Sequence, residues 1–329
     1  MIYSDNAVNI LATKTYKGIG RAWINKNLQG NENVETIVSL LNAKSKQAEE
    51  VTIESFKLTK NEIIKEISAM GDSCDGLIAI GDKDFPNHRG IVKDSEKPIF
   101  LFYKGDLNLL QTKNNNITVI GLLNPDETIE QREKKIIQEI TKYDITIISG
   151  LALGCDSIAH KEAIKNGKSI AILPSPLNNI LPAKNKDLAL DILKTGGLLI
   201  SEYYKNFKHR NELNSRYIER DRLQALFCDT IILIASYAQD SANRWGMHNK
   251  KLDSGARLAM EDAKKYHIPR AVMYNQQTDQ NNPMFDLNRE LLKNDDDVLI
   301  LTIKNLKSII NKIKNQYNIN DVNGKLPGF

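Results

Sequence analysis

The sequence has few cysteines, and their spacing excludes two common kinds of site. Its 329 residues include only Cys74, Cys155 and Cys228, and no Cys-x-x-Cys pair occurs. A structural zinc site needs about four ligands at close spacing, and a disulfide framework needs paired cysteines. We therefore expect no metal site and no disulfide scaffold. Unpaired thiols are typical of a reducing cytoplasm.

Long apolar runs are also missing. No stretch approaches the roughly 18 consecutive apolar residues of a membrane span, and the N-terminus lacks the basic start and apolar run of a signal peptide. We expect a cytoplasmic protein with no membrane partner. Hydrophobic residues make up 41% of the chain, which allows a sizeable core. The formal net charge of +4 permits an anionic partner without requiring one.

Apolar residues recur at helical spacing in residues 1–72, which predicts a small helical domain. Two of its helical stretches flank the segment Lys17-Gly18-Ile19-Gly20-Arg21. A Gly-x-Gly turn exposes backbone N–H groups, and basic neighbours attract a phosphate to them. A plain turn that needs glycine for its dihedral angles explains the segment equally well. Both interpretations stay open, and the first makes Lys17, Gly18, Gly20 and Arg21 a candidate DNA contact.

Residues 73–302 alternate short apolar runs with amphipathic stretches, which predicts a doubly wound, mostly parallel α/β sheet. Buried parallel strands are apolar throughout because helices cover both faces. We expect strands at 76–80, 99–103, 117–121, 145–150, 169–173, 197–201, 230–235, 270–274 and 298–301. We expect helices at 127–143, 156–166, 187–194, 218–227 and 254–266. Residues 303–329 are expected to form a basic helix over 303–317 and a loosely ordered tail.

The most informative segment is a predicted strand followed by a glycine turn and a helix start, residues 147–160. Ligands of doubly wound sheets bind beyond the carboxyl ends of the strands. Gly150 and Gly154 allow close approach of the backbone, and Asp156 suits the N-cap of the next helix. The N–H groups of that helix end form a candidate anion site. The segment lacks the Gly-x-Gly-x-x-Gly fingerprint, so a nicotinamide dinucleotide is not expected.

Ser149-Gly-Leu-Ala-Leu-Gly-Cys-Asp-Ser-Ile-Ala-His160 resembles the Ser-Gly-Leu-Ala-x-Gly-x-Asp-x-x-Ala-His segment of the DNA-processing protein A (DprA/Smf) family. The resemblance spans about residues 80–275, and at least five landmarks in the family's order make chance a poor explanation. Its other landmarks are 84–86, 101–105, Gly196 to Tyr203, Arg220-Asp221-Arg222 and Ser254 to Ala259.

This resemblance implies a Rossmann-like fold that binds single-stranded DNA, helps load the recombinase RecA, forms dimers and has no turnover chemistry or cofactor. Single-strand binders need a positive groove and stacking surfaces, and basic and aromatic residues interleave between Tyr203 and Arg222. A solvated loop with core aromatics is the alternative there. The expected DNA or phosphate contacts are Gly121, Ser149, Gly150, Gly154, Asp156, His160, Lys161, Glu202, Arg216, Tyr217, Arg220, Arg222, Ser254 and Arg257.

The chain departs from the family pattern at the positions that face phosphates. In the loop Gly121-Leu122-Leu123 and at Leu153, leucines stand in place of arginines; we assign the first replacement to Leu122. Asp221 replaces an asparagine, and Glu219 replaces a residue that is commonly basic. Each lost phosphate contact lowers the salt dependence of DNA binding by about one unit. The winged-helix extension of many family members is not expected in 303–329.

Two other classes of function stay open. A nucleotide-sensing Rossmann-like domain, such as occurs in defence systems, would suit a pocket that has lost cations and gained carboxylates. A phosphoribohydrolase of a related family would carry a Pro-Gly-Gly-x-Gly-Thr-x-x-Glu signature, which this chain lacks. A Ser–His–Asp triad drawn from Ser149, His160 and Asp156 has no Gly-x-Ser-x-Gly nucleophile elbow to support it.

Overall fold

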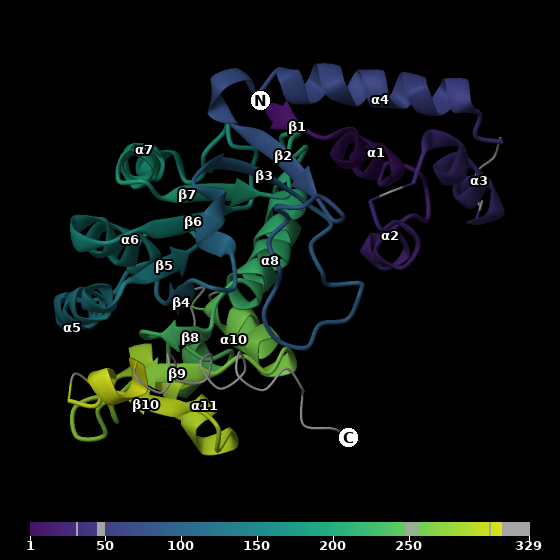
Figure 1. Ribbon diagram of the computed structural model, residues 1–329. Coiled ribbons are helices and arrows are strands. Elements are labelled where there is room, and N and C mark those ends of the chain that lie inside the picture. Colours follow the sequence, from purple (N-terminus) through teal and green to yellow (C-terminus); the bar gives the residue numbers. More distant parts are fainter. Residues whose placement is uncertain (31, 45–49, 248–251, 253–254, 303, 311–329) are drawn as a thin grey trace, which may run out of the picture.

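A ten-stranded sheet runs through the whole molecule in the computed structural model (Figure 1). The structure describes residues 1–329 except 31, 45–49, 248–251, 253–254, 303 and 311–329. The strands are β1 (Ile2–Tyr3), β2 (Gly76–Ala79), β3 (Phe100–Gly105), β4 (Asn115–Ile120), β5 (Ile145–Ser149), β6 (Ser169–Leu173), β7 (Leu198–Ser201), β8 (Thr230–Leu233), β9 (Arg270–Met273) and β10 (Leu299–Leu301). Their order in the sheet is β1-β2-β3-β7-β6-β5-β4-β8-β9-β10.

The sheet is mostly parallel, as the sequence predicts. Strand β3 runs antiparallel to both of its neighbours, β2 and β7, and all other described pairs of neighbouring strands are parallel. Strands β4, β5, β6 and β7 follow one another across the sheet in one direction. The next strand, β8, lies on the opposite side of β4. The chain therefore changes direction between β4 and β8, which is the position where doubly wound sheets open a crevice.

Helices cover both faces of the parallel strands. Helices α5, α6 and α7 pack in a row on one face, and α8 and α10 pack together on the other (Figure 1). The helices are α1 (Asp5–Thr13), α2 (Arg21–Asn27), α3 (Val34–Lys44), α4 (Ile53–Ser68), α5 (Glu127–Ile140), α6 (Cys155–Asn166), α7 (Lys186–Lys194), α8 (Arg210–Leu226), α9 (Ser241–Arg244), α10 (Ala256–Lys265) and α11 (Asp286–Asn294). This covering explains why β5, β6 and β8 are buried along their whole length.

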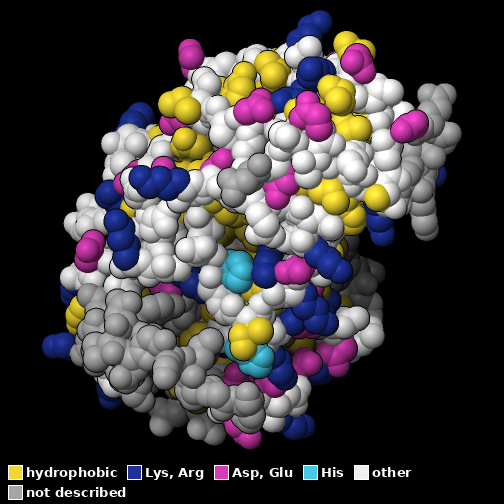
Figure 2. Space-filling view, turned by 45° about the vertical axis from the view of Figure 1, so that its right-hand side comes forward, with side chains coloured by type: hydrophobic (Ala, Val, Ile, Leu, Met, Phe, Trp, Pro, Cys, Tyr) yellow, Lys and Arg dark blue, Asp and Glu magenta, His cyan; other side chains and the backbone are white. Residues whose placement is uncertain are grey.

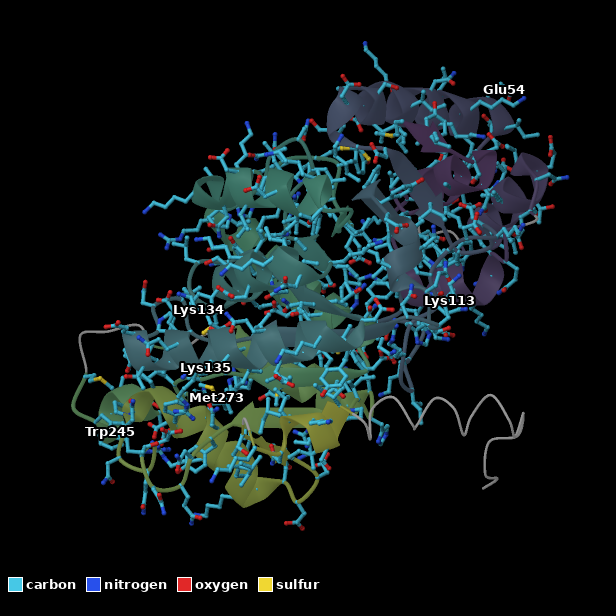
Figure 3. The ribbon with its side chains drawn as sticks, turned by 60° about the vertical axis from the view of Figure 1, so that its left-hand side comes forward. Glu54, Lys113, Lys134, Lys135, Trp245 and Met273 are labelled. Atoms are coloured by element: carbon cyan, nitrogen blue, oxygen red, sulfur yellow. The ribbon has the colours of Figure 1, made fainter. Side chains whose placement is uncertain are left out.

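The N-terminal helices share their apolar core with the sheet. Ile10 of α1 and Phe56 of α4 belong to the same buried cluster as Phe100 and Phe102 of β3. Helical structure in this region was expected, but strand β1 was not, and it pairs with β2 in parallel. Figure 3 shows Glu54 at one end of α4, far from α5 on the other side of the molecule. A domain boundary at residue 72 stays a prediction.

One helical prediction needs correction, and another lies partly outside the described residues. Helix α8 begins at Arg210 rather than near residue 218, because the His209 side chain accepts a hydrogen bond from Glu212 N at 3.2 Å. The Glu212 carboxylate accepts in return from Lys208 N at 2.8 Å, which closes the helix end. Of the helix expected over 303–317, residues 306–310 are helical, and residues 303 and 311–317 lie outside the described residues.

A buried ion pair attaches the loop before β3 to the beginning of β4 and β8. The Arg89 guanidinium donates to Asp229 Oδ1 at 2.6 Å and to the carbonyl of Asn114 at 2.9 Å. Asp229 Oδ2 accepts from Asn116 N at 2.6 Å. Both side chains of the ion pair are almost fully buried, so neither charge has water as an alternative partner.

Replacing Arg89 by methionine is expected to lower the free energy of unfolding by about 3–5 kcal/mol, because Asp229 is left buried without its counter-ion. The exposed Lys135 on α5 (Figure 3) provides the matched control, and Lys135→Met should change stability by less than about 0.5 kcal/mol. Urea denaturation of both variants measures the difference. Equal, small losses in the two variants would contradict the structural role of Arg89.

Candidate functional site

A pocket of about 460 Å³ opens at the carboxyl ends of β4 and β5, beside α8. This is the crevice that the strand order predicts, and its volume lies in the range of about 300–1,000 Å³ typical of small-ligand sites. The residues that line it come from the loops after β4, β5 and β6, from α8 and from the start of α10: Ile120, Gly121, Leu123, Ala152, Leu153, Asp156, Pro182, Asn214, Tyr217, Arg220, Asp221, Gln224, Gly255 and Ala256.

The two glycines of the turn after β5 allow close packing within the protein. A Cβ on Gly150 would lie 1.7 Å from Nη1 of Arg220, so the guanidinium lies directly against the backbone of the turn. Gly154 has φ of +73°, and a Cβ there would lie 2.2 Å from the Leu122 carbonyl oxygen. The sequence predicts that a ligand approaches the backbone closely at these glycines. In the structure the atoms that do so belong to Arg220 and Leu122.

The carboxylate of Asp156 accepts hydrogen bonds from two backbone amides of this turn. The sequence predicts Asp156 as the N-cap of α6, but the N-cap is Gly154. Instead, Asp156 Oδ2 accepts hydrogen bonds from Gly150 N at 3.1 Å and Ala152 N at 3.2 Å. The Asn185 amide binds the other side of the turn through the carbonyls of Leu151 and Ala152. The predicted cradle of free amides for a phosphate is therefore wrong at Gly150 and Ala152.

One face of α8 forms the second wall of the pocket. Asn214, Tyr217, Arg220, Asp221 and Gln224 are spaced by three or four residues or are adjacent, so they share this face. Nη1 of Arg220 lies 3.2 Å from Asp221 Oδ1, and its guanidinium lies 5.6 Å from the centre of the Tyr217 ring. Sequence reasoning missed Asn214 and Gln224, although their helical spacing from Arg220 could have identified both.

Charge in the pocket is unlike that of a phosphate site. Among the described residues, the lining contains one guanidinium, Arg220, and two carboxylates, Asp156 and Asp221. Burial raises the pKa of Asp221 to about 7, although the charge of Arg220 opposes this shift. Burial also raises the pKa of Asp156, again against the effect of Arg220. Above neutral pH the ionised Asp221 carboxylate therefore offsets the charge of Arg220.

Two leucines lie where the family resemblance places arginines, but one assignment needs correction. Leu122 is buried in the core, whereas its neighbour Leu123 is 53% exposed and lines the pocket. Leu153 is 37% exposed and also lines it. The replaced pocket residue after β4 is therefore Leu123. Both leucines add apolar surface to the mouth and no charge.

The two arginines expected to bind DNA together, Arg220 and Arg222, lie apart: Arg220 lines the pocket and Arg222 does not. Arg222 points away from the pocket and binds Glu202 with both nitrogens, Nη2 to Oε1 at 2.7 Å and Nη1 to Oε2 at 3.1 Å. Arg21 of the Gly-x-Gly segment pairs with Glu219 and lies 3.6 Å from Glu202. Glu202 and Arg222 therefore form a structural network that joins the N-terminal helices to α8, and neither lines the pocket.

This network also bears on the candidate DNA contact at Lys17, Gly18, Gly20 and Arg21. Gly20 is the N-cap of α2, without a side-chain cap, and α2 has only seven residues. The Arg21 charge is already balanced by two carboxylates. The turn between α1 and α2 exists as expected, and its DNA contact stays a prediction.

Ser149 and His160 are fully buried and do not line the pocket, so their expected contact with DNA needs correction. Ser149 Oγ donates to the Val119 carbonyl at 2.7 Å. His160 Nδ1 lies 2.7 Å from Ser169 Oγ, and burial together with the charge of Arg220 lowers the pKa of His160 to about 3. The imidazole is therefore neutral at physiological pH, and it supports the packing of α6 on the sheet.

The other expected contacts lie around the pocket or outside the described residues. Arg216 stacks on the Tyr203 ring at 4.3 Å and donates to the Lys205 carbonyl. Arg257 pairs with Glu261 at 2.7 Å. Lys161 is exposed on α6, in a separate groove over α5–α7, and Ser254 lies outside the described residues. Of the thirteen expected contacts that the structure describes, four line the pocket: Gly121, Asp156, Tyr217 and Arg220.

The aromatic residues before α8 are half-buried and do not line the pocket. Tyr203 is covered by Arg216, and Tyr204 packs against Phe102 at 5.8 Å between ring centres. Only Tyr217 of the predicted stacking group lines the pocket. Figure 2 shows basic and acidic side chains interspersed over the drawn face, so the surface there lacks an extended patch of one sign.

Within the described residues, no cluster of three or more His, Cys, Asp or Glu side chains could hold a metal ion. No described helix is long and apolar enough to cross a membrane. The strand order and the pocket at its crevice place the protein among the doubly wound α/β proteins that bind ligands beyond the carboxyl ends of their strands.

Comparison with known proteins then identifies the family. The family model of DNA recombination-mediator protein A matches residues 76–243, which is half of the chain and includes most of the pocket lining. The chain belongs to this family.

Several relatives share part of the sequence. The protein Smf of Borreliella burgdorferi is 30% identical over 180 residues, which cover 54% of this chain and 55% of that protein. The DNA processing protein DprA of Streptococcus pneumoniae is 33% identical over 139 residues, 42% of this chain and 47% of that one. The chain thus matches about half the length of these curated relatives.

Solved structures extend the likeness to the whole fold. DNA processing protein A of Streptococcus pneumoniae superimposes with a TM-score of 0.65 over 92% of this chain and 96% of that chain, at 20% identity. The protein from Helicobacter pylori, described by its single-stranded DNA binding mode, gives a TM-score of 0.56 at 27% identity. That likeness covers 74% of this chain and 98% of the other. The predicted Rossmann-like fold and family are confirmed.

The raised pKa of Asp221 predicts a stability difference that depends on pH. Between about pH 4 and pH 7 the folded chain keeps a proton on Asp221 that the unfolded chain has lost, so the free energy of unfolding falls as pH rises through this window. Asp221→Asn cannot ionise. Relative to the wild type, this variant should gain about 1–3 kcal/mol of stability between pH 5 and pH 8.

Urea denaturation at the two pH values measures this gain. The nearby Asp262, whose pKa burial raises to about 6, remains in both proteins and cancels in the comparison. A difference between the two proteins that does not change with pH would show that Asp221 ionises normally in the folded state.

Proposed function

We propose that the chain binds single-stranded DNA through the pocket between the β5 turn and α8, as a recombination mediator without catalytic turnover. Membership of the DNA recombination-mediator protein A family supports this function. The Helicobacter pylori relative, described as a single-stranded DNA binder, aligns over nearly its whole length. The single structural observation that carries the proposal is the pocket itself, which lies at the ligand-binding edge of the sheet and within the matched segment.

The lining is suited to binding rather than to catalysis. Among the described residues that line the pocket there is no serine, cysteine, histidine or lysine, so of the common nucleophiles and general bases the described lining offers only the carboxylates of Asp156 and Asp221. Tyr217 offers a half-buried ring on which a base can stack. Lys184, Lys208 and Arg210 are exposed close in sequence to the lining residues Pro182 and Asn214, and can hold phosphates outside the pocket.

The wider biological role follows from the same proposal. A recombinase of the RecA type would be the protein partner, a homodimer the assembly and the cytoplasm the location, as the family resemblance implies. These partners need their own tests, since the matched part corresponds to about half of the curated relatives.

Binding of a small nucleotide derivative is a second candidate, and the charge of the pocket favours it. Two carboxylates and one guanidinium suit a nucleoside or sugar better than a long polyanion. The two candidates differ in what they bind: heat stabilisation by a mononucleotide, together with no affinity for oligonucleotides, would favour the second.

Replacing Tyr217 tests whether the pocket is the DNA site. Tyr217→Ala should weaken binding of a fluorescent oligo(dT) by about fivefold or more, because base stacking on an aromatic ring contributes about 1–3 kcal/mol. Tyr217→Phe keeps the ring and should bind as the wild type does. Fluorescence anisotropy measures both, and equal affinities in the alanine and phenylalanine variants would place the DNA elsewhere.

Restoring the missing cations should strengthen binding. Leu123→Arg and Leu153→Arg place a positive charge at the exposed mouth of the pocket, and each should increase the salt dependence of oligo(dT) binding by about one unit. Leu58, exposed on α4 and far along the chain from the pocket, gives the matched control Leu58→Arg. If the salt dependence of binding increases equally in all three variants, the effect comes from net charge, and the strand does not bind at the pocket.

A further inference from the structure

The pocket lacks what a phosphate requires but has groups that suit a nucleobase. Its single guanidinium is paired with Asp221 at 3.2 Å, and the amides of Gly150 and Ala152 are bound to Asp156. A phosphate placed here would meet two carboxylates, and the amides of Gly150 and Ala152 would not be free to bind it. A neutral ring meets no such repulsion, and the leucines and Tyr217 offer it apolar surface.

Two buried donors in the lining have no hydrogen-bond partner among the residues that the structure describes. These are Arg220 Nε and Gln224 Nε2, and the two residues are only 5% and 1% exposed. A buried donor without a partner is costly to the folded state, so a ligand that accepts from it gains affinity. The backbone of Gln224 is held against β4, because its main-chain carbonyl accepts from Thr118 Oγ1 at 2.7 Å.

Asp221 adds an acceptor beside these donors. Its carboxylate is buried and contacts Arg220, and its Oδ2 lies close to the backbone of Gly255. A Cβ on Gly255 would lie 2.6 Å from Asp221 Oδ2. Two donors and one acceptor thus lie together on one wall of the pocket, with one helical turn of α8 between Arg220 and Gln224.

We infer that this pocket receives one base of the bound strand edge-on and selects bases with an exocyclic amino group, cytosine over thymine, through Asp221, Arg220 and Gln224. The inference rests on the proposed binding of single-stranded DNA. The sugar–phosphate chain stays outside the pocket, and Lys184 and Arg210 are exposed cations close in sequence to the lining residues Pro182 and Asn214. Single-stranded bases can be turned out and recognised at their Watson–Crick edge in this way.

The donor and acceptor pattern explains the choice of cytosine. Carboxylates accept from the amino group on N4 of cytosine, while O2 and N3 of the same edge accept from donors such as those of Arg220 and Gln224. Thymine carries an oxygen in place of that amino group, so it would face the Asp221 carboxylate with a like partial charge. A site that binds a polar edge discriminates strongly against an analogue that leaves its groups unpaired.

A competition between two pyrimidine strands tests the inference. Fluorescence anisotropy compares oligo(dT) with a strand of equal length in which alternate bases are cytosine, at about pH 8, above the pKa of about 7 of Asp221. The wild type should bind the cytosine strand at least about fivefold more tightly. In Asp221→Asn the ratio of the two affinities should fall to about one, whatever happens to each affinity.

Two further variants keep the test decisive. Asp187→Asn removes an exposed carboxylate of α7 outside the pocket, and it should keep the wild-type ratio. Gln224→Met keeps the side-chain volume and removes the amide, so its ratio should also fall towards one. If Asp221→Asn does not fold, the affinity ratio of Gln224→Met tests whether the pocket selects cytosine.

The outcomes separate the inference from the proposed function. Tight but equal binding of the two strands by the wild type would overturn base selection and leave DNA binding intact. A cytosine preference that survives in both Asp221→Asn and Gln224→Met would overturn the assignment of these residues. No binding of either strand would contradict the proposed function itself, and the inference would fail with it.

Discussion

The contact between the Arg220 guanidinium and the backbone at Gly150 is the constraint on which the rest of the site depends. It exists only because residue 150 has no Cβ, which would lie 1.7 Å from Arg220. Asp156 and Asn185 fix the same turn from its amide and carbonyl sides. Helix α8 is thereby held against the end of β5, and the pocket is the space that remains between them.

The same contact determines the chemistry of the pocket. Arg220 is committed to the turn and to Asp221, so its charge is largely balanced inside the protein. With leucines at 123 and 153, no second cation among the described residues lines the pocket. Electrostatic attraction for a strand must then come from the surface around the mouth, and the pocket contributes shape, stacking and hydrogen bonds. This division between phosphate contacts outside and base contacts inside is physically consistent with single-strand recognition.

The sequence predicted the parts of the structure that depend on local pattern. Buried strands are apolar throughout, so nearly every strand of the sheet was located, and the glycine turn after β5 was recognised as the ligand edge. Strand β1, with two exposed residues, has no such pattern. The long-range partners were also inaccessible: Arg220 and Arg222 differ by two positions, which places them on different sides of α8. Only the fold shows that one faces Gly150 and the other Glu202. Likewise, Asp156 has a cap residue's chemistry but binds the turn before the helix.

Amide hydrogen exchange, measured with and without oligo(dT), tests the central claim most directly. If the strand enters the space between the β5 turn and α8, bound DNA should slow exchange in residues 150–156 and 214–224 and leave α2 and the outer face of α5 unchanged. Protection that is confined to the segment between α1 and α2, or to the lysine-lined groove over α5–α7, would contradict the account.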